Sequence, residues 1–186
     1  DVGAVKGHPR RVVTDVDGNS EERNKTISVF NGVPPLIDGS DDEAAEVDAV
    51  GQWLAEVAEN GVVPHEFGVF VRSVSEIPRA RLAVEKSGMP YKVLDDDVET
   101  TSGHVSISTM HLAKGLEYRA VAVMACDDEV VPLQERMETV GDDADLQEVY
   151  ETERHLLYVA CTRARDHLLV SGVNPFSEFL DDLQLE

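Results

Sequence analysis

Arg163, near the end of the chain, is the first residue whose type and position suggest chemistry. The apolar residues Leu156, Leu157, Val159 and Ala160 precede it at spacings of three and four, which predicts a helix with one buried face. A guanidinium is always charged and has a rigid fork of donors, so it can hold a phosphate with two hydrogen bonds. The alternative is a surface cation near a helix C-terminus, where the helix dipole favours positive charge.

A second segment, residues 105–123, places polar residues between two strand patterns. Residues 105–109 alternate in polarity and residues 120–124 form a continuous apolar run, so each predicts a strand of a parallel sheet. In open α/β sheets, ligands bind beyond the carboxyl ends of the strands. We therefore expect Arg163 to be exposed at that edge, together with the polar residues of the turn: Thr109, His111, Lys114, Gly115 and Glu117.

Both segments resemble the last two motifs of the superfamily 1 DNA helicases of the UvrD/Rep type. Residues 109–118 read T-M-H-L-A-K-G-L-E-Y and match the family pattern T-x-H-x-A-K-G-L-E followed by Phe or Tyr. Residues 153–164 match the pattern E-R-x-L-x-Y-V-A-x-T-R-A. The order of elements from 26 to 172 also resembles the second RecA-like motor domain of these helicases. The resemblance implies an α/β fold with a RecA-like (P-loop NTPase-type) parallel sheet and helices on both faces.

The resemblance also implies a nucleotide site. Arg163 matches the arginine that stabilises charge on the transferring phosphoryl group, so it is the implied catalytic residue. Glu117 matches the residue that reaches the nucleotide ribose, and Gly115 permits a close backbone approach, although it could be a plain turn glycine. The implied cofactors are ATP and Mg²⁺, bound mainly by an N-terminal RecA-like domain of the same polypeptide.

A single-stranded DNA site is implied by three further matches: Arg72, Thr109 and His111. Glu153 and Arg154 are expected to form a supporting ion-pair network that orients the arginine helix, although His155 departs from the arginine that is common there. The role of Lys114 stays open between DNA contact and helix packing. No metal-ligating spacing of histidine or cysteine occurs in the chain.

The chain has no G-x-x-x-x-G-K phosphate loop, which these helicases carry on their first motor domain. The resemblance implies that the chain is part of an ATP-dependent DNA helicase with a role in DNA repair, and the missing phosphate loop leads us to expect that it is inactive alone. The connection from Leu94 to Val105 is short where larger family members insert a subdomain. Two alternatives remain: a non-catalytic helicase-like protein-interaction module, and a nucleotide-binding fold for a metabolic substrate.

The remaining pattern divides the chain into a linker or irregular segment, 1–25, and the motor domain, 26–186, with an acidic mobile loop at 127–150. We expect helices at 41–60, capped by Ser40 or Asp41, at 75–87 and at 175–186, and strands at 67–71 and 90–94.

Composition adds limits. The net charge of −21 over 186 residues argues against simple nucleic-acid binding. Cys126 and Cys161 are expected in the core rather than in a disulfide or zinc site. The absence of a long apolar run predicts a cytoplasmic protein without membrane contact.

Overall fold

The computed structural model describes residues 13–14, 20–21, 34–138 and 143–183, and the chain divides into two units, Asp1–Asn31 and Gly32–Glu186. In the first unit, β1 (Val13–Thr14) pairs antiparallel with β2 (Ser20–Glu21). The expected boundary at residue 25 lies outside the described residues. The second unit holds every candidate site residue.

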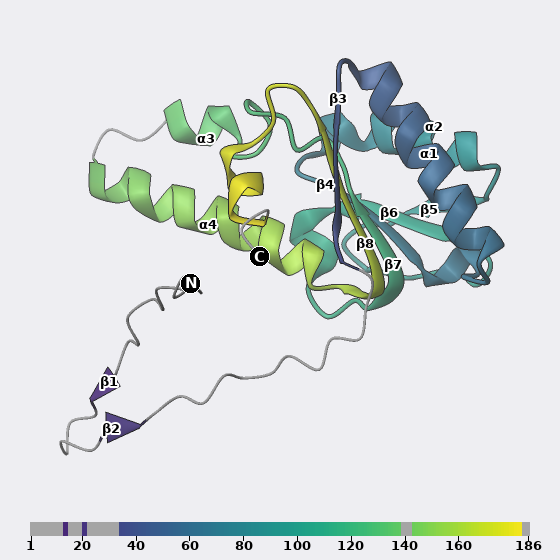
Figure 1. Cartoon of the computed structure of the whole chain (residues 1–186), viewed down its shortest axis with the longest axis horizontal. Coiled ribbons are helices and arrows are strands. Elements are labelled where there is room, and N and C mark those ends of the chain that lie inside the picture. Colours follow the sequence, from purple (N-terminus) through teal and green to yellow (C-terminus); the bar gives the residue numbers. More distant parts are fainter. Residues whose placement is uncertain (1–12, 15–19, 22–33, 139–142, 184–186) are drawn as a thin grey trace, which may run out of the picture. The chain divides into compact units, whose positions relative to one another are not determined.

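The second unit is built on a six-stranded sheet whose strand pairs are all parallel, in the order β3-β8-β7-β4-β6-β5 (Figure 1). The strands are β3 (Leu36–Ser40), β4 (Phe67–Val71), β5 (Tyr91–Val93), β6 (Val105–Thr109), β7 (Tyr118–Val123) and β8 (Ala164–Val173). The predicted α/β class with a parallel sheet is therefore confirmed. The sequence patterns missed the edge strand β3, because Asp38 and Gly39 interrupt its short apolar run.

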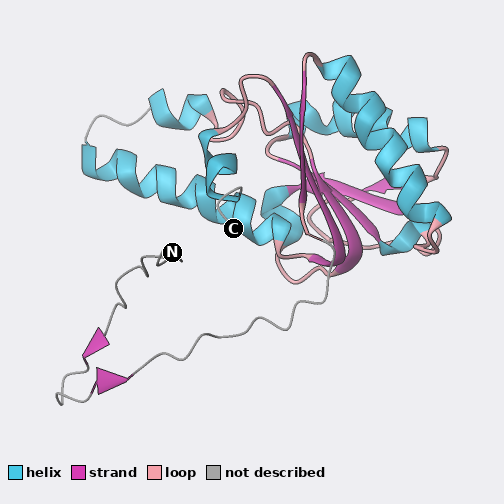
Figure 2. Ribbon diagram, viewed as in Figure 1, coloured by secondary structure: helices cyan, strands magenta, loops and turns pink. Residues whose placement is uncertain are grey.

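Helices cover both faces of this sheet, as predicted (Figure 2). The helices α1 (Glu43–Glu59) and α2 (Ile77–Ser87) pack on one face, and α4 (Asp143–Cys161) packs on the other. Alternate residues of β4 point to opposite faces: Val69 joins the core under α1 and α2, whereas Phe70 joins the core under α4. Two apolar layers thus hold the sheet rigid between the helices.

Short helical turns complete the unit: the 3₁₀ turns η1 (Pro64–Glu66), η2 (Val74–Glu76), η3 (Met110–Ala113) and η4 (Glu178–Leu183), and the short helix α3 (Gln134–Glu138). The cap of α1 is Asp42, whose carboxylate accepts a hydrogen bond from Ala45 N at 2.8 Å, one or two residues beyond the expected caps. At its other end α1 stops at Asn60 and Gly61, as predicted, and Gly61 has φ 96°.

Three expectations about the C-terminal part need correction. The acidic segment 127–150 is not a loop, because α3 and the first half of α4 occupy most of its described residues. The helix of the second motif ends at Cys161, so Arg163 lies beyond it. The expected helix 175–186 is the shorter turn η4, although Phe179 and Leu180 are buried. Cys126 and Cys161 are buried and free, as predicted.

Candidate functional site

The expected site residues lie at two opposite edges of the sheet. In a parallel sheet all strands begin at one edge and end at the other. Thr109 is the last residue of β6 and Arg72 directly follows β4, so both lie at the carboxyl edge. Glu117 directly precedes β7 and Arg163 directly precedes β8, so these two lie at the amino edge. The structure therefore separates the residues expected at DNA from those expected at the nucleotide.

One segment joins the two edges. Residues 110–117 run from the end of β6 to the start of β7 across the face of the sheet that α4 covers. Met110 and Ala113 anchor η3 in the core on that face, with 1% and 0% of their surface exposed. Buried side chains thus hold this segment in the core between the two edges of the sheet.

Arg163 is half-buried at the amino edge, and its guanidinium binds neighbouring backbone and hydroxyl groups. Nε donates to Val159 O at 3.0 Å, Nη1 donates to Leu116 O at 3.2 Å, and Nη2 donates to Thr162 Oγ1 at 3.1 Å. Tyr118 N in turn donates to Arg163 O at 3.0 Å. The two motifs are thus in direct contact, through atoms that the sequence alone could not pair.

The expectation that Arg163 lies at the carboxyl edge is wrong. After α4 ends, only Thr162 and Arg163 precede β8, and a helix that leads into a parallel strand delivers the chain to the amino edge. Glu117 and Gly115 lie in the turn beside Arg163, and both are exposed. Gly115 has φ 84° with open space around it, so a side chain there would be strained by the backbone and not by contacts. Lys114 is exposed in the same turn.

At the carboxyl edge, Arg72 is buried in an ion pair with Glu153 of α4. Arg72 Nε donates to Glu153 Oε2 at 2.5 Å and Nη2 donates to Oε1 at 2.6 Å, with 3% and 0% of the two residues exposed. This two-pronged geometry uses the donors that a DNA phosphate would need. The structure therefore gives Arg72 a positioning role that differs from the direct DNA contact expected from its motif.

Glu153 is the centre of the ion-pair network that the sequence led us to expect. It also accepts hydrogen bonds from Arg136 Nη1 at 2.8 Å and from Leu133 N at 3.2 Å. Burial alone would raise the pKa of Glu153, but the hydrogen bonds from Arg72 and Leu133 N and the charges of Arg72 and Arg136 lower it overall. Arg154 instead lies over the rings of Tyr150 and Phe179, at 5.3 and 5.2 Å from their centres.

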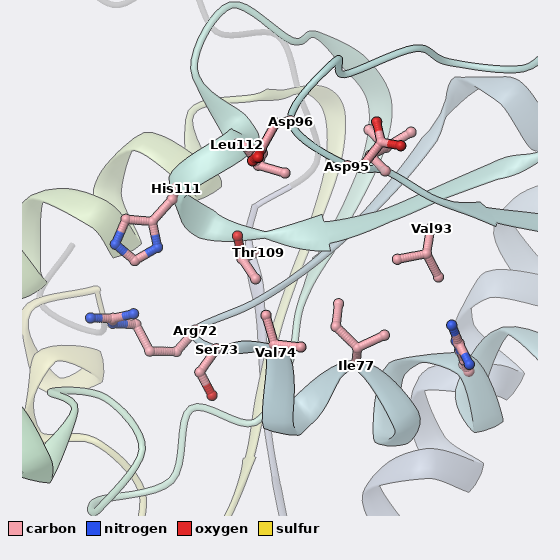
Figure 3. Close-up of a pocket in the computed structure, with 12 residues that line it drawn as sticks. Arg72, Ser73, Val74, Ile77, Val93, Asp95, Asp96, Thr109, His111 and Leu112 are labelled. Carbon is pink, nitrogen blue, oxygen red and sulfur yellow. The ribbon is translucent and has the colours of Figure 1, made fainter.

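Thr109 and His111 line a cavity of about 610 Å³ at the carboxyl edge (Figure 3). The pKa of His111 is lowered from its ordinary value of 6.5, first by burial and then by the charge of Arg72. His111 is therefore neutral at pH 7 and offers hydrogen bonds rather than a positive charge. Thr109 and His111 thus lie in the same cavity, as expected, whereas the guanidinium of Arg72 is buried and paired with Glu153.

A second buried ion-pair cluster was missed in the sequence. Glu46 of α1 is fully buried, pairs with Arg79, and accepts hydrogen bonds from Ser171 Oγ at 2.6 Å and Ala125 N at 3.0 Å. Arg79 Nη1 in turn donates to Asp127 Oδ2 at 2.7 Å. The signal was present, because Glu46 falls on the apolar face of α1, four residues before Val50.

Metal and membrane features are not found in the part of the chain that the structure describes. No group of three or more His, Cys, Asp or Glu among the described residues is placed to hold a metal ion. None of the helices described is both long and apolar enough to cross a bilayer.

Comparison with known proteins matches residues 92–174 to the UvrD-like helicase C-terminal domain. The ATP-dependent DNA helicase UvrD1 of Mycobacterium leprae is 38% identical over 103 residues, which cover 50% of this chain and 12% of that protein. A probable DNA helicase II homologue of Rickettsia felis is 26% identical over 177 residues, or 92% of this chain and 25% of that protein. The chain thus spans a quarter or less of these relatives.

A solved structure supports the fold. It is the C-terminal domain of a possible DNA helicase from Lactobacillus plantarum, with a TM-score of 0.60, 23% identity and 80% coverage of each chain.

Proposed function

Residues 92–174 form a UvrD-like helicase C-terminal domain, and from this premise we propose that the chain acts as the second RecA-like motor domain of an ATP-dependent DNA helicase or translocase. The observation that carries this proposal is the segment 109–118, which presents Thr109 and His111 at one edge of the sheet and Glu117 at the other. A segment that contributes residues to both a strand site and a nucleotide site gives a physical route for coupling them.

The amino edge is the proposed nucleotide face. ATP supplies the terminal phosphoryl group and Mg²⁺ neutralises part of its charge, and both would be held mainly by an N-terminal RecA-like domain of the same polypeptide. Such a nucleotide would be contacted from the amino edge, where Glu117 and Arg163 lie.

Arg163 has the chemistry for this contact. Its Nη1 donates to a neutral carbonyl, Leu116 O, at 3.2 Å, and exchanging that acceptor for a phosphate oxygen would give a stronger, charge-assisted bond. The exchange would also release the Leu116 carbonyl, and with it the turn that leads back to η3 and His111. Arg163 would then stabilise charge on the phosphate and report its presence to the carboxyl edge.

The two edges can be tested separately in a protein that joins this chain to the proposed N-terminal ATP-binding domain. His111→Gln should raise the Kd for a thymidine oligonucleotide about 2- to 10-fold, the value of one hydrogen bond, and leave the half-saturating ATP concentration unchanged. Glu117→Gln should raise the half-saturating ATP concentration and leave the Kd for the oligonucleotide unchanged. Lys86→Ala, which removes an exposed charge on α2, is the control for both. If both variants change the same property, the two-edge assignment is wrong.

His111 gives a further prediction on pH. A strand phosphate beside His111 would favour its protonated form, so DNA binding would take up a proton because the free-state pKa lies below 6.5. The oligonucleotide affinity should therefore rise as the pH falls from 7.5 to 5.5, and His111→Gln should remove part of that rise. His65→Gln, in the exposed turn η1, is the control for the general loss of negative charge at low pH. Identical pH profiles for wild type and His111→Gln would contradict a phosphate contact.

A second candidate function is a non-catalytic helicase-like protein-interaction module. The burial of Arg72 and the net charge of −21 favour it, because both reduce the attraction for a DNA strand. The absence of ATP turnover in a protein that joins this chain to an intact ATP-binding domain would support the module and exclude the motor.

A further inference from the structure

The cavity at the carboxyl edge has an apolar floor. Five aliphatic side chains line it: Val74, Ile77, Val93, Leu94 and Leu112. All of them except Leu94 are labelled in Figure 3. Val74 is the most exposed of the large apolar residues in the described part of the chain, with 75% of its surface open to solvent. Exposed aliphatic surface in a concave site favours an apolar ligand group, because burial removes that surface from water.

The wall of the cavity is acidic. Asp95 and Asp96, which also line it, are exposed in the connection between β5 and β6. A tight turn holds them, with Val98 N donating to Asp95 O at 2.9 Å and Asp97 N donating to Asp95 Oδ1 at 3.2 Å. The turn at Asp95 is thus held by hydrogen bonds, and the exposed carboxylates of Asp95 and Asp96 attract cations and repel phosphates.

The cavity offers less positive than negative charge to a ligand. Arg81 lines it, but the guanidinium of Arg72 is already paired with Glu153. The described residues that line the cavity include no Phe, Tyr or Trp on which a nucleobase could stack. The described lining of the cavity therefore offers no cluster of cations and no stacking ring, so a DNA strand would be contacted only by the part of the lining that holds Thr109 and His111.

We propose that this cavity is a docking site for a protein segment in which aliphatic side chains are flanked by lysine or arginine. The aliphatic groups would cover Val74 and its neighbours, and the flanking cations would face Asp95 and Asp96. The volume of about 610 Å³ lies in the range of pockets that hold a small ligand, so the cavity has room for more than one aliphatic side chain. A partner of this kind would compete with a DNA strand at Thr109 and His111, since both would occupy the same edge.

Two synthetic peptides and the 186-residue chain test this site. The probe is an acetylated hexapeptide, Lys-Lys-Ile-Leu-Lys-Lys, and its control, Lys-Lys-Ser-Ser-Lys-Lys, carries the same charge without the aliphatic groups. Binding is followed by NMR through the methyl signals of Val74, Val93 and Leu112. The aliphatic peptide should shift these signals and bind at least about fivefold more tightly than the control, as expected for burying aliphatic groups.

The variants separate docking from general charge attraction. Asp95→Asn/Asp96→Asn should weaken the aliphatic peptide about 3- to 10-fold, as for two rim ion pairs, whereas Asp41→Asn/Asp48→Asn removes two exposed charges from another surface and should change little. Val74→Asp is the sharper test, because it adds a negative charge and removes apolar surface. Docking predicts weaker binding by Val74→Asp, and simple charge attraction predicts tighter binding.

Three results would overturn the proposal. These are equal affinity for the two peptides, tighter binding of the aliphatic peptide by Val74→Asp, and a thymidine octanucleotide that shifts the same methyl signals at lower concentration than the peptide. The last result would assign the cavity to nucleic acid. Circular dichroism of each variant verifies that the fold is retained.

Discussion

Replacing Arg163 by alanine should lower ATP turnover about 10³- to 10⁵-fold in a protein that joins this chain to the proposed N-terminal ATP-binding domain, with little change in ATP binding. The large effect is expected because the guanidinium would stabilise charge that develops on the phosphoryl group only during transfer. The structure places this guanidinium at the amino edge beside Glu117, half-buried and held by the carbonyls of Val159 and Leu116. Steady-state turnover and equilibrium binding of a fluorescent ATP analogue measure the two effects separately.

Arg163→Lys is the informative companion. Lysine keeps the charge but loses the rigid fork, so turnover should lie between those of wild type and Arg163→Ala. Because Arg163 also ties Leu116 O to the end of α4, thermal unfolding must show that both variants are folded at the assay temperature. Lys86→Ala on α2 controls for the loss of one charge. Turnover that survives in folded Arg163→Ala would remove Arg163 from catalysis.

The position of Arg163 shows what a linear pattern can and cannot tell. The apolar spacing correctly placed a helix before it, and the strand pattern of 105–109 was correct to the residue. The wrong prediction was the edge of the sheet at which Arg163 lies. It rested on the rule that ligands bind at the carboxyl ends of strands, whereas the order of α4 and β8 along the chain determines the position of Arg163. Since α4 leads into β8 through two residues, the amino edge could have been deduced from the element order.

The role of Arg72 could not have been deduced in the same way. Its partner Glu153 is 81 residues away, and no sequence spacing relates the end of a strand to the middle of a helix on the sheet face. The burial of this pair depends on how the end of β4 packs against α4 and α3, and a linear pattern does not contain that information. The cluster around Glu46 differs, because an acid on the apolar face of α1 already implied a buried partner.

Glu153→Gln should lower the free energy of unfolding by about 3–5 kcal/mol, the usual cost of leaving one member of a buried ion pair without its partner. Both carboxylate oxygens are used, since Arg72 binds each of them and Arg136 and Leu133 N add further bonds. An amide can accept on one side only and leaves the Arg72 charge uncompensated. Chemical denaturation of the 186-residue chain, with a fixed slope against denaturant, measures the loss.

A double replacement tests whether Arg72 and Glu153 stabilise the fold as a pair or independently. Arg72→Met/Glu153→Met removes both charges, so it should cost less than the sum of the two single replacements. Additive losses would mean that the two side chains stabilise the fold independently, which the bond lengths of 2.5 and 2.6 Å argue against.

The pH dependence of stability gives a second readout of the same network. The pKa of Glu153 is lowered from 4.5 in the folded chain, so below pH 4.5 the unfolded chain takes up a proton first. The stabilisation is therefore complete above pH 4.5 and is lost as the pH falls through the lower folded-state pKa. Glu153→Gln should flatten this acid limb, and Asp48→Asn at the exposed pair with Lys86 should not. Parallel acid limbs for wild type and Glu153→Gln would show that Arg72 does not depend on an ionised partner, and that α4 is held to β4 by packing alone.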